Sequence, residues 1–235
     1  MRVADELRAE VLASGLTRLG SERELVGRFG VSRFTVRQAL GVLQAEGLVE
    51  PVQGRGVFVR ESVVRRRMVC WRRLAEHSSE PADSADAALH CDEVKSEVSR
   101  VAAPGKIAER LGVAVGTVVL ARRRQRVSAG RPVKLATTYL PLELARETVL
   151  EALDVGPGGP YARLAEFGHV VTRFETELRT RMPLPEEAHV LRVGTGVPVL
   201  RVVRTALDAA SRPLGVDDLV LAGDRYELVF TTQTS

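Results

Sequence analysis

Four polar residues near position 35 have the types and spacing that read DNA bases. The stretch SRFTVRQAL, residues 32–40, places Arg33, Thr35, Arg37 and Gln38 on one short helical segment. Arg33 and Arg37 are four residues apart and therefore share a helix face. A guanidinium group can bond O6 and N7 of one guanine, and a threonine can bond a phosphate or touch a thymine methyl group. The pattern predicts a helix that contacts DNA.

The flanking residues predict the helices that present this segment. Ser21 followed by Glu24 is a capping-box pattern that starts a helix, and Gly30 ends it with a left-handed C-cap. Ser32 is a good N-cap for the next helix, which Gly47 ends. Two short helices joined by a tight turn predict a helix-turn-helix, whose second helix enters the major groove.

A first helix and a hairpin complete the module. Residues 3–12 carry hydrophobic residues at helical spacing, and the β-like runs LVEPV and VFV flank the sequence QGRG. At this hairpin tip Gly54 lets the backbone approach the minor groove, and Arg55 suits the negative potential there. The pattern predicts a winged helix over residues 1–60, with Arg23 in reach of the same groove.

The charge distribution points to the same part of the chain. The first 67 residues hold 12 Arg and no Lys against 8 Asp and Glu, so they carry the whole net charge of +4. A basic segment joined to a neutral body indicates a module that binds a polyanion and a body that regulates it. A basic, solvated face without a partner remains the alternative.

Composition favours a protein of the cytoplasm. The chain has 235 residues, 45% of them hydrophobic, and no apolar run approaches the roughly 20 residues of a membrane span. The N-terminus is charged and has no signal-peptide core, and two cysteines are too few for a secreted disulfide framework. We therefore expect no membrane partner.

Residues 21–59 closely resemble the N-terminal domain of the bacterial GntR-type transcription regulators. The matching segments are SERELVGRFGVSRFTVRQAL, EGL and GRGVFV. The resemblance implies base and phosphate contacts at Arg23, Arg33, Thr35 and Arg37, and a minor-groove approach by Gly54. Gly20 departs from the family pattern, which usually has proline there, and the loop SGLTRLGS is shorter than usual.

A linker and a larger domain follow. Residues 61–73 contain Arg65, Arg66 and Arg67, which either add phosphate contacts or are simply solvated. Residues 74–235 form the expected second domain, whose first part, residues 76–90, reads as a loop.

The second domain contains an internal repeat. The segments that begin at Leu111 and Leu191 align at an offset of 80 residues, and each follows a short helix introduced by proline, at Pro104 and Pro185. Each copy predicts helix, strand, hairpin and strand. Two such units predict one antiparallel sheet covered by helices, an α+β fold whose junction suits a pocket.

Roughly residues 74–235 are similar to UTRA, the effector-binding domain of the HutC subfamily of GntR regulators, which has a chorismate-lyase-like fold. The similarity is carried by VAAPGKIAERLGVAVGTVV, RPVKLATTYLP, RPLGVDDLV and GDRYELVF. It implies a homodimer formed through this domain and a small-molecule effector that changes the affinity for a DNA operator.

Five residues are candidates for contact with the effector. In the family, the pair matching Arg124 and Arg126 helps to bind anionic groups such as sugar phosphates; cross-strand ion pairs are the other reading. The remaining candidates are Tyr139, Arg173 and Asp218.

Three departures weaken the expected anion site. Ala136 stands where the family commonly has glutamate, Gly159 replaces a serine, and the family's Glu-Tyr-Ser-Arg run is Gly-Val-Asp-Asp at residues 215–218. Loss of a basic residue and gain of two acids lower the attraction for an anion. The sequence therefore predicts a less anionic effector, or none.

No pattern supports catalysis, a metal site or a cofactor. The histidines at 77, 90, 169 and 189 are scattered, and no Gly-x-Ser-x-Gly elbow or phosphate-binding loop occurs. The interpretation is a repressor that binds an inverted-repeat operator with half-sites about 10 bp apart or a multiple. The alternatives are an architectural protein that coats DNA, or a regulator whose second domain only dimerises.

Overall fold

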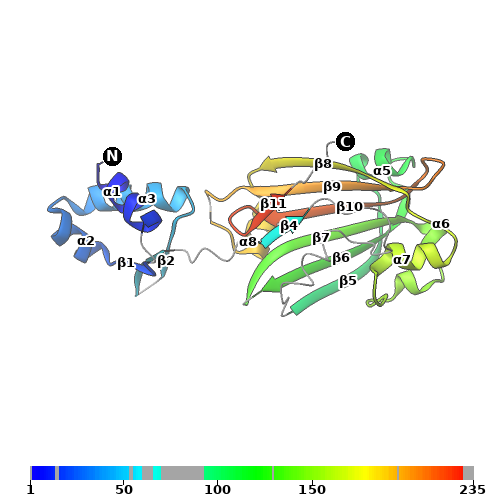
Figure 1. Cartoon of the computed structure of the whole chain (residues 1–235), viewed down its shortest axis with the longest axis horizontal. Coiled ribbons are helices and arrows are strands. Elements are labelled where there is room, and N and C mark those ends of the chain that lie inside the picture. Colours follow the sequence, from blue (N-terminus) through cyan, green and yellow to red (C-terminus); the bar gives the residue numbers. More distant parts are fainter. Residues whose placement is uncertain are drawn as a thin grey trace, which may run out of the picture. The chain divides into compact units, whose positions relative to one another are not determined.

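Figure 1 shows the computed structural model, which describes residues 2–13, 16–52, 55–59, 66–69, 93–128, 130–194 and 196–229. Backbone contacts divide the chain into two compact units, Met1–Arg65 with Met182–Pro198, and Arg66–Arg181 with Val199–Ser235. The expected domains, residues 1–60 and 74–235, stay a proposal, because this division groups residues 182–198 with the N-terminal unit. No helix in the described ranges is long and apolar enough to cross a membrane.

The part of the N-terminal unit that runs from α1 to β3 is a winged helix. Its elements are α1 (Arg2–Ala13), β1 (Arg18–Gly20), α2 (Glu22–Phe29), α3 (Arg33–Ala45), β2 (Val49–Val52) and β3 (Gly56–Val59). The strands form an antiparallel sheet in the order β1-β3-β2. The expected helices and hairpin are therefore present, and β1 is an addition, since residues 18–20 were expected to be loop.

Local side-chain bonds set the helix ends as the sequence predicts. Ser21 Oγ accepts a hydrogen bond from the Glu24 backbone N–H at 3.3 Å, and Glu24 accepts from the Ser21 N–H at 2.5 Å. Gly30 ends α2 in the left-handed region, with φ of 62°. Ser32 then caps α3 by accepting from the Thr35 N–H at 3.2 Å.

One hydrophobic core joins the helices and strands of the winged helix. Its buried residues are Ala4, Leu7, Leu19, Leu25, Val36, Ala39, Leu40, Leu43, Val49 and Val57. They come from α1, α2, α3 and the three strands, so burial of this core fixes the recognition helix against the wing.

The larger unit is built on a six-stranded antiparallel sheet. Its strands are β5 (Glu93–Ala102), β6 (Val118–Ser128), β7 (Arg131–Pro141), β8 (Arg173–Arg181), β9 (Val199–Leu207) and β10 (Pro213–Ala222). Their order is β5-β6-β7-β10-β9-β8. Its helices are α5 (Gly105–Leu111), α6 (Leu142–Ala145), the 3-10 helix η1 (Val149–Glu151) and α7 (Gly159–Glu166). Helix α8 (Pro185–Leu191) lies in the segment that the backbone contacts group with the N-terminal unit. The strands β4 (Arg66–Val69) and β11 (Tyr226–Val229) form a separate parallel pair.

The strand order is symmetric about its centre and confirms the internal repeat. The first copy supplies β5, β6 and β7, and the second supplies β8, β9 and β10 in the mirrored order. Each copy also contains one helix, α5 or α8, after its first strand. The repeated unit is therefore strand-helix-strand-strand, and the sequence interpretation missed the first strand of each copy.

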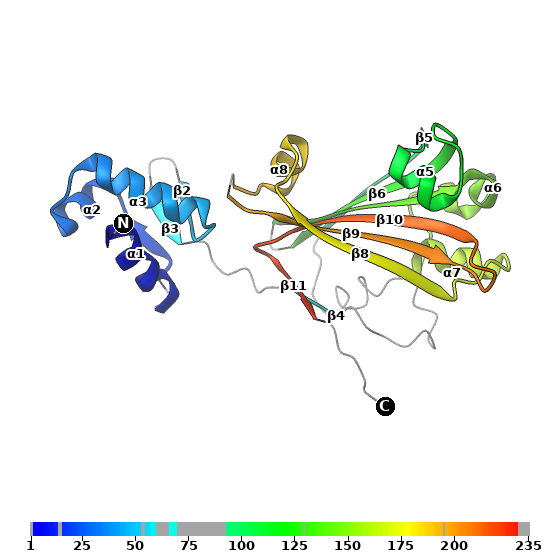
Figure 2. The same cartoon turned by 90° about the horizontal axis from the view of Figure 1, so that it is seen from above.

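The sheet has two faces with different coverings. Alternate residues define the α7 face, where Leu120, Leu140 and Ala206 pack against Leu150 of η1 and against α7. The opposite, α5 face carries Val119, Val203 and Val216 against α5. Figure 2 shows α5 on one side of the sheet, with β11 and β4 on the other. Tyr226 of β11 packs with residues of the α7 face.

Candidate functional site

The candidate DNA-reading arginines lie at the start of α3 and are well exposed. The side chains of Arg33 and Arg37 are 72% and 64% exposed. Both belong to the first turns after the Ser32 cap, the part of a recognition helix that meets base edges. The structure therefore brings these two candidates together on one accessible face.

Glu22 of α2 holds both arginines, and the sequence interpretation did not single it out. Its carboxylate oxygens accept from the Nε–H of Arg33 at 2.8 Å and of Arg37 at 2.9 Å. The two guanidinium groups, Arg37 more strongly, lower the pKa of this carboxyl, so it stays charged near neutral pH. Because Glu22 takes the Nε–H groups, the terminal NH₂ groups of both arginines remain as donors for a base or a phosphate.

The other candidates on the helices differ in how available they are. Arg23 and Gln38 are exposed, whereas Thr35 is half-buried. The Thr35 hydroxyl lies 2.9 Å from Ser32 Oγ, so it belongs to the helix cap in this state. Phe34 is a residue that the sequence interpretation passed over; it is 70% exposed at the second position of α3. An exposed aromatic ring here suits contact with a thymine methyl group.

The wing is described except at its tip. Gly54 lies outside the described residues, while the guanidinium carbon of Arg55 lies 5.4 Å from the centre of the Phe58 ring. Gly20 has φ of +106°, which proline cannot adopt, and this explains the departure from the family's proline. At Gly56 a Cβ would lie 3.0 Å from the Gly20 carbonyl oxygen, so glycine allows β3 to approach β1.

The linker candidates are only partly described. Arg65 lies outside the described residues, as do Cys70, His77, His90 and Cys91, and Arg66 and Arg67 belong to β4. In the described ranges, no group of three metal-ligating side chains could hold an ion.

The five effector candidates do not form one site. Register places Arg124 and Arg126 on the α7 face, because Arg124 pairs with Ala136 and Ala136 with Leu219. Tyr139 and Asp218 lie on the opposite, α5 face, beside Val216 and Val203. Arg173 also belongs to the α5 face, opposite Leu207. Side chains alternate between the two faces along each strand, so the five candidates lie at two separate places.

A buried polar row crosses the α7 face. Asp217 accepts from the Thr138 hydroxyl at 2.8 Å and from Arg204 Nη2 at 2.7 Å. The side chains of Arg204 and Asp217 are only 8% and 4% exposed. The Arg204 guanidinium also lies 4.8 Å from the centre of the Phe174 ring. These residues form a paired, dehydrated centre that sequence reasoning missed.

The same face leaves no room at position 215 for the glutamate that the family has there. At Gly215 a Cβ would lie 2.8 Å from Leu140 and 3.1 Å from Tyr161, which is buried. Burial raises the pKa of the Tyr161 hydroxyl well above its usual value, so this group remains protonated. Glycine at position 215 thus lets α7 pack closely on β10.

Arg122 ties the sheet to the segment after α6. Its guanidinium donates to the backbone carbonyls of Leu150, Ala152 and Leu153, the last at 3.0 Å. Burial, with the nearby charge of Arg124, lowers the pKa of Arg122.

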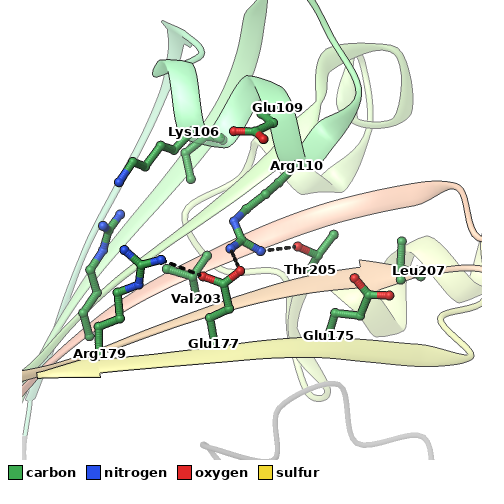
Figure 3. Close-up of a pocket in the computed structure, with 11 residues that line it drawn as sticks. Lys106, Glu109, Arg110, Glu175, Glu177, Arg179, Val203, Thr205 and Leu207 are labelled. Atoms are coloured by element: carbon green, nitrogen blue, oxygen red, sulfur yellow. Dashed lines mark hydrogen bonds and ion pairs between the residues drawn. The ribbon is translucent and has the colours of Figure 1, made fainter.

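An open cavity of about 500 Å³ lies on the α5 face, between α5 and strands β8 and β9 (Figure 3). Arg110 reaches into it, with Nη2 at 2.5 Å from Glu177 and Nη1 at 3.2 Å from the Thr205 hydroxyl. Arg201 also lines the cavity and binds Asp218 through two hydrogen bonds of 2.9 and 2.6 Å. Burial and the Asp218 carboxylate raise the pKa of the neighbouring Tyr139. The cavity therefore presents both charges, largely paired with each other.

Two family models match this chain, one at its N-terminus and one over its larger part. Residues 1–59 match the model of "Bacterial regulatory proteins, gntR family", and residues 94–227 match the UTRA domain. The HTH-type transcriptional regulator Rv0792c of Mycobacterium tuberculosis is 31% identical over 98% of this chain and 84% of its own length. The histidine utilization repressor of Pseudomonas putida is 28% identical over 90% of this chain and 81% of its own.

Solved structures agree. A crystal structure of a GntR-family transcriptional regulator covers 100% of this chain and 97% of its own, with 29% identity and a TM-score of 0.69. PhnF from Mycobacterium smegmatis covers 99% of this chain, and the chain covers all of PhnF, with 26% identity and a TM-score of 0.58. These families and relatives are transcription regulators and not enzymes. The chain belongs to the GntR family of bacterial regulators and combines its helix-turn-helix with a UTRA domain, as HutC-type members do.

Proposed function

We propose that this protein is a sequence-specific repressor that binds an inverted-repeat DNA operator as a homodimer in the cytoplasm, and that a small molecule in the UTRA domain changes its operator affinity. The observation that carries the proposal is the pair Arg33 and Arg37, exposed at the start of α3 and held by Glu22. A fixed pair of guanidinium forks suits guanine recognition, whereas a protein that coats DNA relies on dispersed charge.

Repression is supported by relatives. NagR of Bacillus subtilis, 27% identical over 90% of this chain, is named a transcriptional repressor, as is the histidine utilization protein of Pseudomonas putida. Two winged helices related by a twofold axis then read half-sites about 10 bp apart, or a multiple of that spacing.

The test is a footprint of the purified protein on the DNA upstream of its own gene, at near-physiological salt and with excess competitor DNA. We expect a protected inverted repeat. Replacement of Arg33 or Arg37 by Ala should cost about 1–3 kcal/mol of operator binding and relax base preference at one position. Arg146→Ala, which removes an exposed arginine from the UTRA domain, is the matched control. Diffuse, salt-sensitive protection by every variant would instead support the architectural alternative.

For the effector, the contacts favour a ligand with little negative charge. Asp217 binds Arg204 and Asp218 binds Arg201, so the positive charge of each arginine is already balanced and attracts an anionic ligand less. The α7 face is also filled by Tyr161 next to Gly215. Arg124 and Arg126 on the α7 face, and Tyr139, Arg173 and Asp218 on the α5 face, remain the proposed contacts, at two separate places.

Calorimetry with a hexose phosphate and with the same unphosphorylated hexose tests this proposal. A dissociation constant below about 10 μM for the phosphate, with much weaker binding of the neutral sugar, would contradict it. If no small molecule shifts operator affinity, the UTRA domain serves only to dimerise.

A further inference from the structure

Strand β8 ends the six-stranded sheet and exposes a long edge. It is nine residues long, and β9 is its only neighbour among the described strands. Six consecutive side chains, residues 175–180, are exposed on both faces. An edge of this length is a template for a further strand, and proteins that avoid such pairing shorten, bend or block it.

The charges along β8 are arranged so that the strand complements itself. On the α5 face the order is Glu175, Glu177, Arg179, Arg181, two acids followed by two bases. When two such strands run antiparallel about Leu178, Glu177 faces Arg179 of the second copy and Glu175 faces Arg181. Opposite charges across strands stabilise a pairing, and like charges destabilise it.

Neighbouring registers lack this match. Centring the pair on Glu177 sets that carboxylate against its own copy, and centring it on Arg179 sets two guanidinium groups together. The Leu178 register also pairs Thr176 with Thr180 on the α7 face. There Leu178, 38% exposed, meets Leu178 of the second copy across the twofold axis.

We propose that β8 of one chain pairs antiparallel with β8 of a second copy, about Leu178, and joins the two sheets into one. The inference deepens the proposed function, because it names the surface that makes the homodimer. Backbone hydrogen bonds and the Leu178 contact hold the seam, while exposed ion pairs mainly select its register, since such pairs contribute little each.

The pairing also places the α5-face cavity beside the seam. Glu175, Glu177 and Arg179 line this cavity (Figure 3). In the proposed register all three face residues of the second copy. Glu177 binds Arg110 of α5. A ligand that binds Arg110 in its place would leave the Glu177 carboxylate free to pair with Arg179 of the second copy. An effector in the cavity can therefore act on the dimer directly.

Cysteine cross-linking of the full-length protein tests the register. In a background with Cys70→Ser and Cys91→Ser, Leu178→Cys should form a disulfide-linked dimer under mild oxidation. Residues directly opposite in antiparallel strands have Cα atoms about 4.5–5.5 Å apart, within disulfide range. Thr176→Cys or Thr180→Cys alone should not cross-link, since each would lie roughly 13 Å from its own copy. A mixture of these two variants should cross-link.

Charge exchange provides a second measurement. Glu177→Arg or Arg179→Glu should raise the dimer dissociation constant at least about threefold, and an equimolar mixture should form the heterodimer preferentially. Glu97→Arg on β5, the opposite edge of the sheet, is the matched control and should leave the dissociation constant unchanged.

Two results would overturn the proposal: wild-type protein that sediments as a monomer, or a dimer in which Leu178→Cys cross-links no better than Thr176→Cys. Either result leaves the footprint of wild-type protein to judge DNA recognition separately. A protected operator without the β8 cross-link rejects only the seam.

Discussion

At the scale of single residues, Glu22 is the feature that distinguishes a pair of positioned arginines from two solvated ones. Its carboxylate binds the Nε–H of Arg33 and of Arg37 at 2.8 and 2.9 Å. We expect Glu22→Gln to weaken operator binding about threefold to tenfold, because an amide gives up both ion pairs. Binding to non-specific DNA should weaken less or strengthen, since a negative charge is removed beside the phosphates.

Competition between operator and random DNA measures this specificity ratio. Glu6→Gln, on α1 of the same unit, removes the same charge from an exposed ion pair with Arg2 and serves as the control. An unchanged ratio in Glu22→Gln would mean that Glu22 has no positioning role.

Residue-scale features were predictable where they are local. Ser21, Glu24 and Gly30 act within one helix, so their spacing alone predicts the cap bonds that the structure contains. Glu22 was not predictable in the same way, because its partners lie 11 and 15 residues along the chain. The faces that Tyr139 and Arg124 occupy were not predictable from the sequence, because only strand register tells which face each side chain lies on.

At the scale of elements, the edge strands were the hardest to predict. β8 reads RFETELRTR, where charged residues alternate with Phe174, Thr176, Leu178 and Thr180, so a period of two is present in the sequence. In β5, EVKSEVSRVA, the alternation holds only at the start. Neither strand carries a continuous apolar stripe, so both were passed over as polar segments. β1 was missed because its three residues are a strand only by pairing with β3, about 40 residues later.

The buried polar row of Thr138, Asp217 and Arg204 leads to a prediction about stability. Asp217→Ala should destabilise the UTRA domain by about 3–5 kcal/mol, because it leaves the Arg204 charge buried and unpaired. Glu166→Ala, which breaks the exposed pair with Arg163 on α7, should cost about 0–1 kcal/mol. Urea unfolding monitored by far-UV circular dichroism gives the free energy of unfolding of each variant.

Replacing both members of the buried pair tests the cause. Arg204→Leu with Asp217→Leu should recover most of the stability that Asp217→Ala loses, because no charge is then left without a partner. A double variant as unstable as Asp217→Ala would mean that packing, and not charge, explains the loss.

At the scale of the whole molecule, DNA affinity and dimerisation should separate along the chain. Residues 1–67 carry the whole excess of positive charge, and the N-terminal unit has its own core around Leu7, Leu25 and Leu43. On a duplex with one half-site, a fragment of residues 1–67 should therefore bind with the salt dependence of one full-length subunit. On the complete inverted repeat the full-length protein should bind about 100- to 10,000-fold more tightly, because dimerisation makes the second contact intramolecular. Titrations at several salt concentrations measure both affinities. If the fragment and the full-length protein bind the complete repeat equally well, the UTRA domain does not couple the two winged helices.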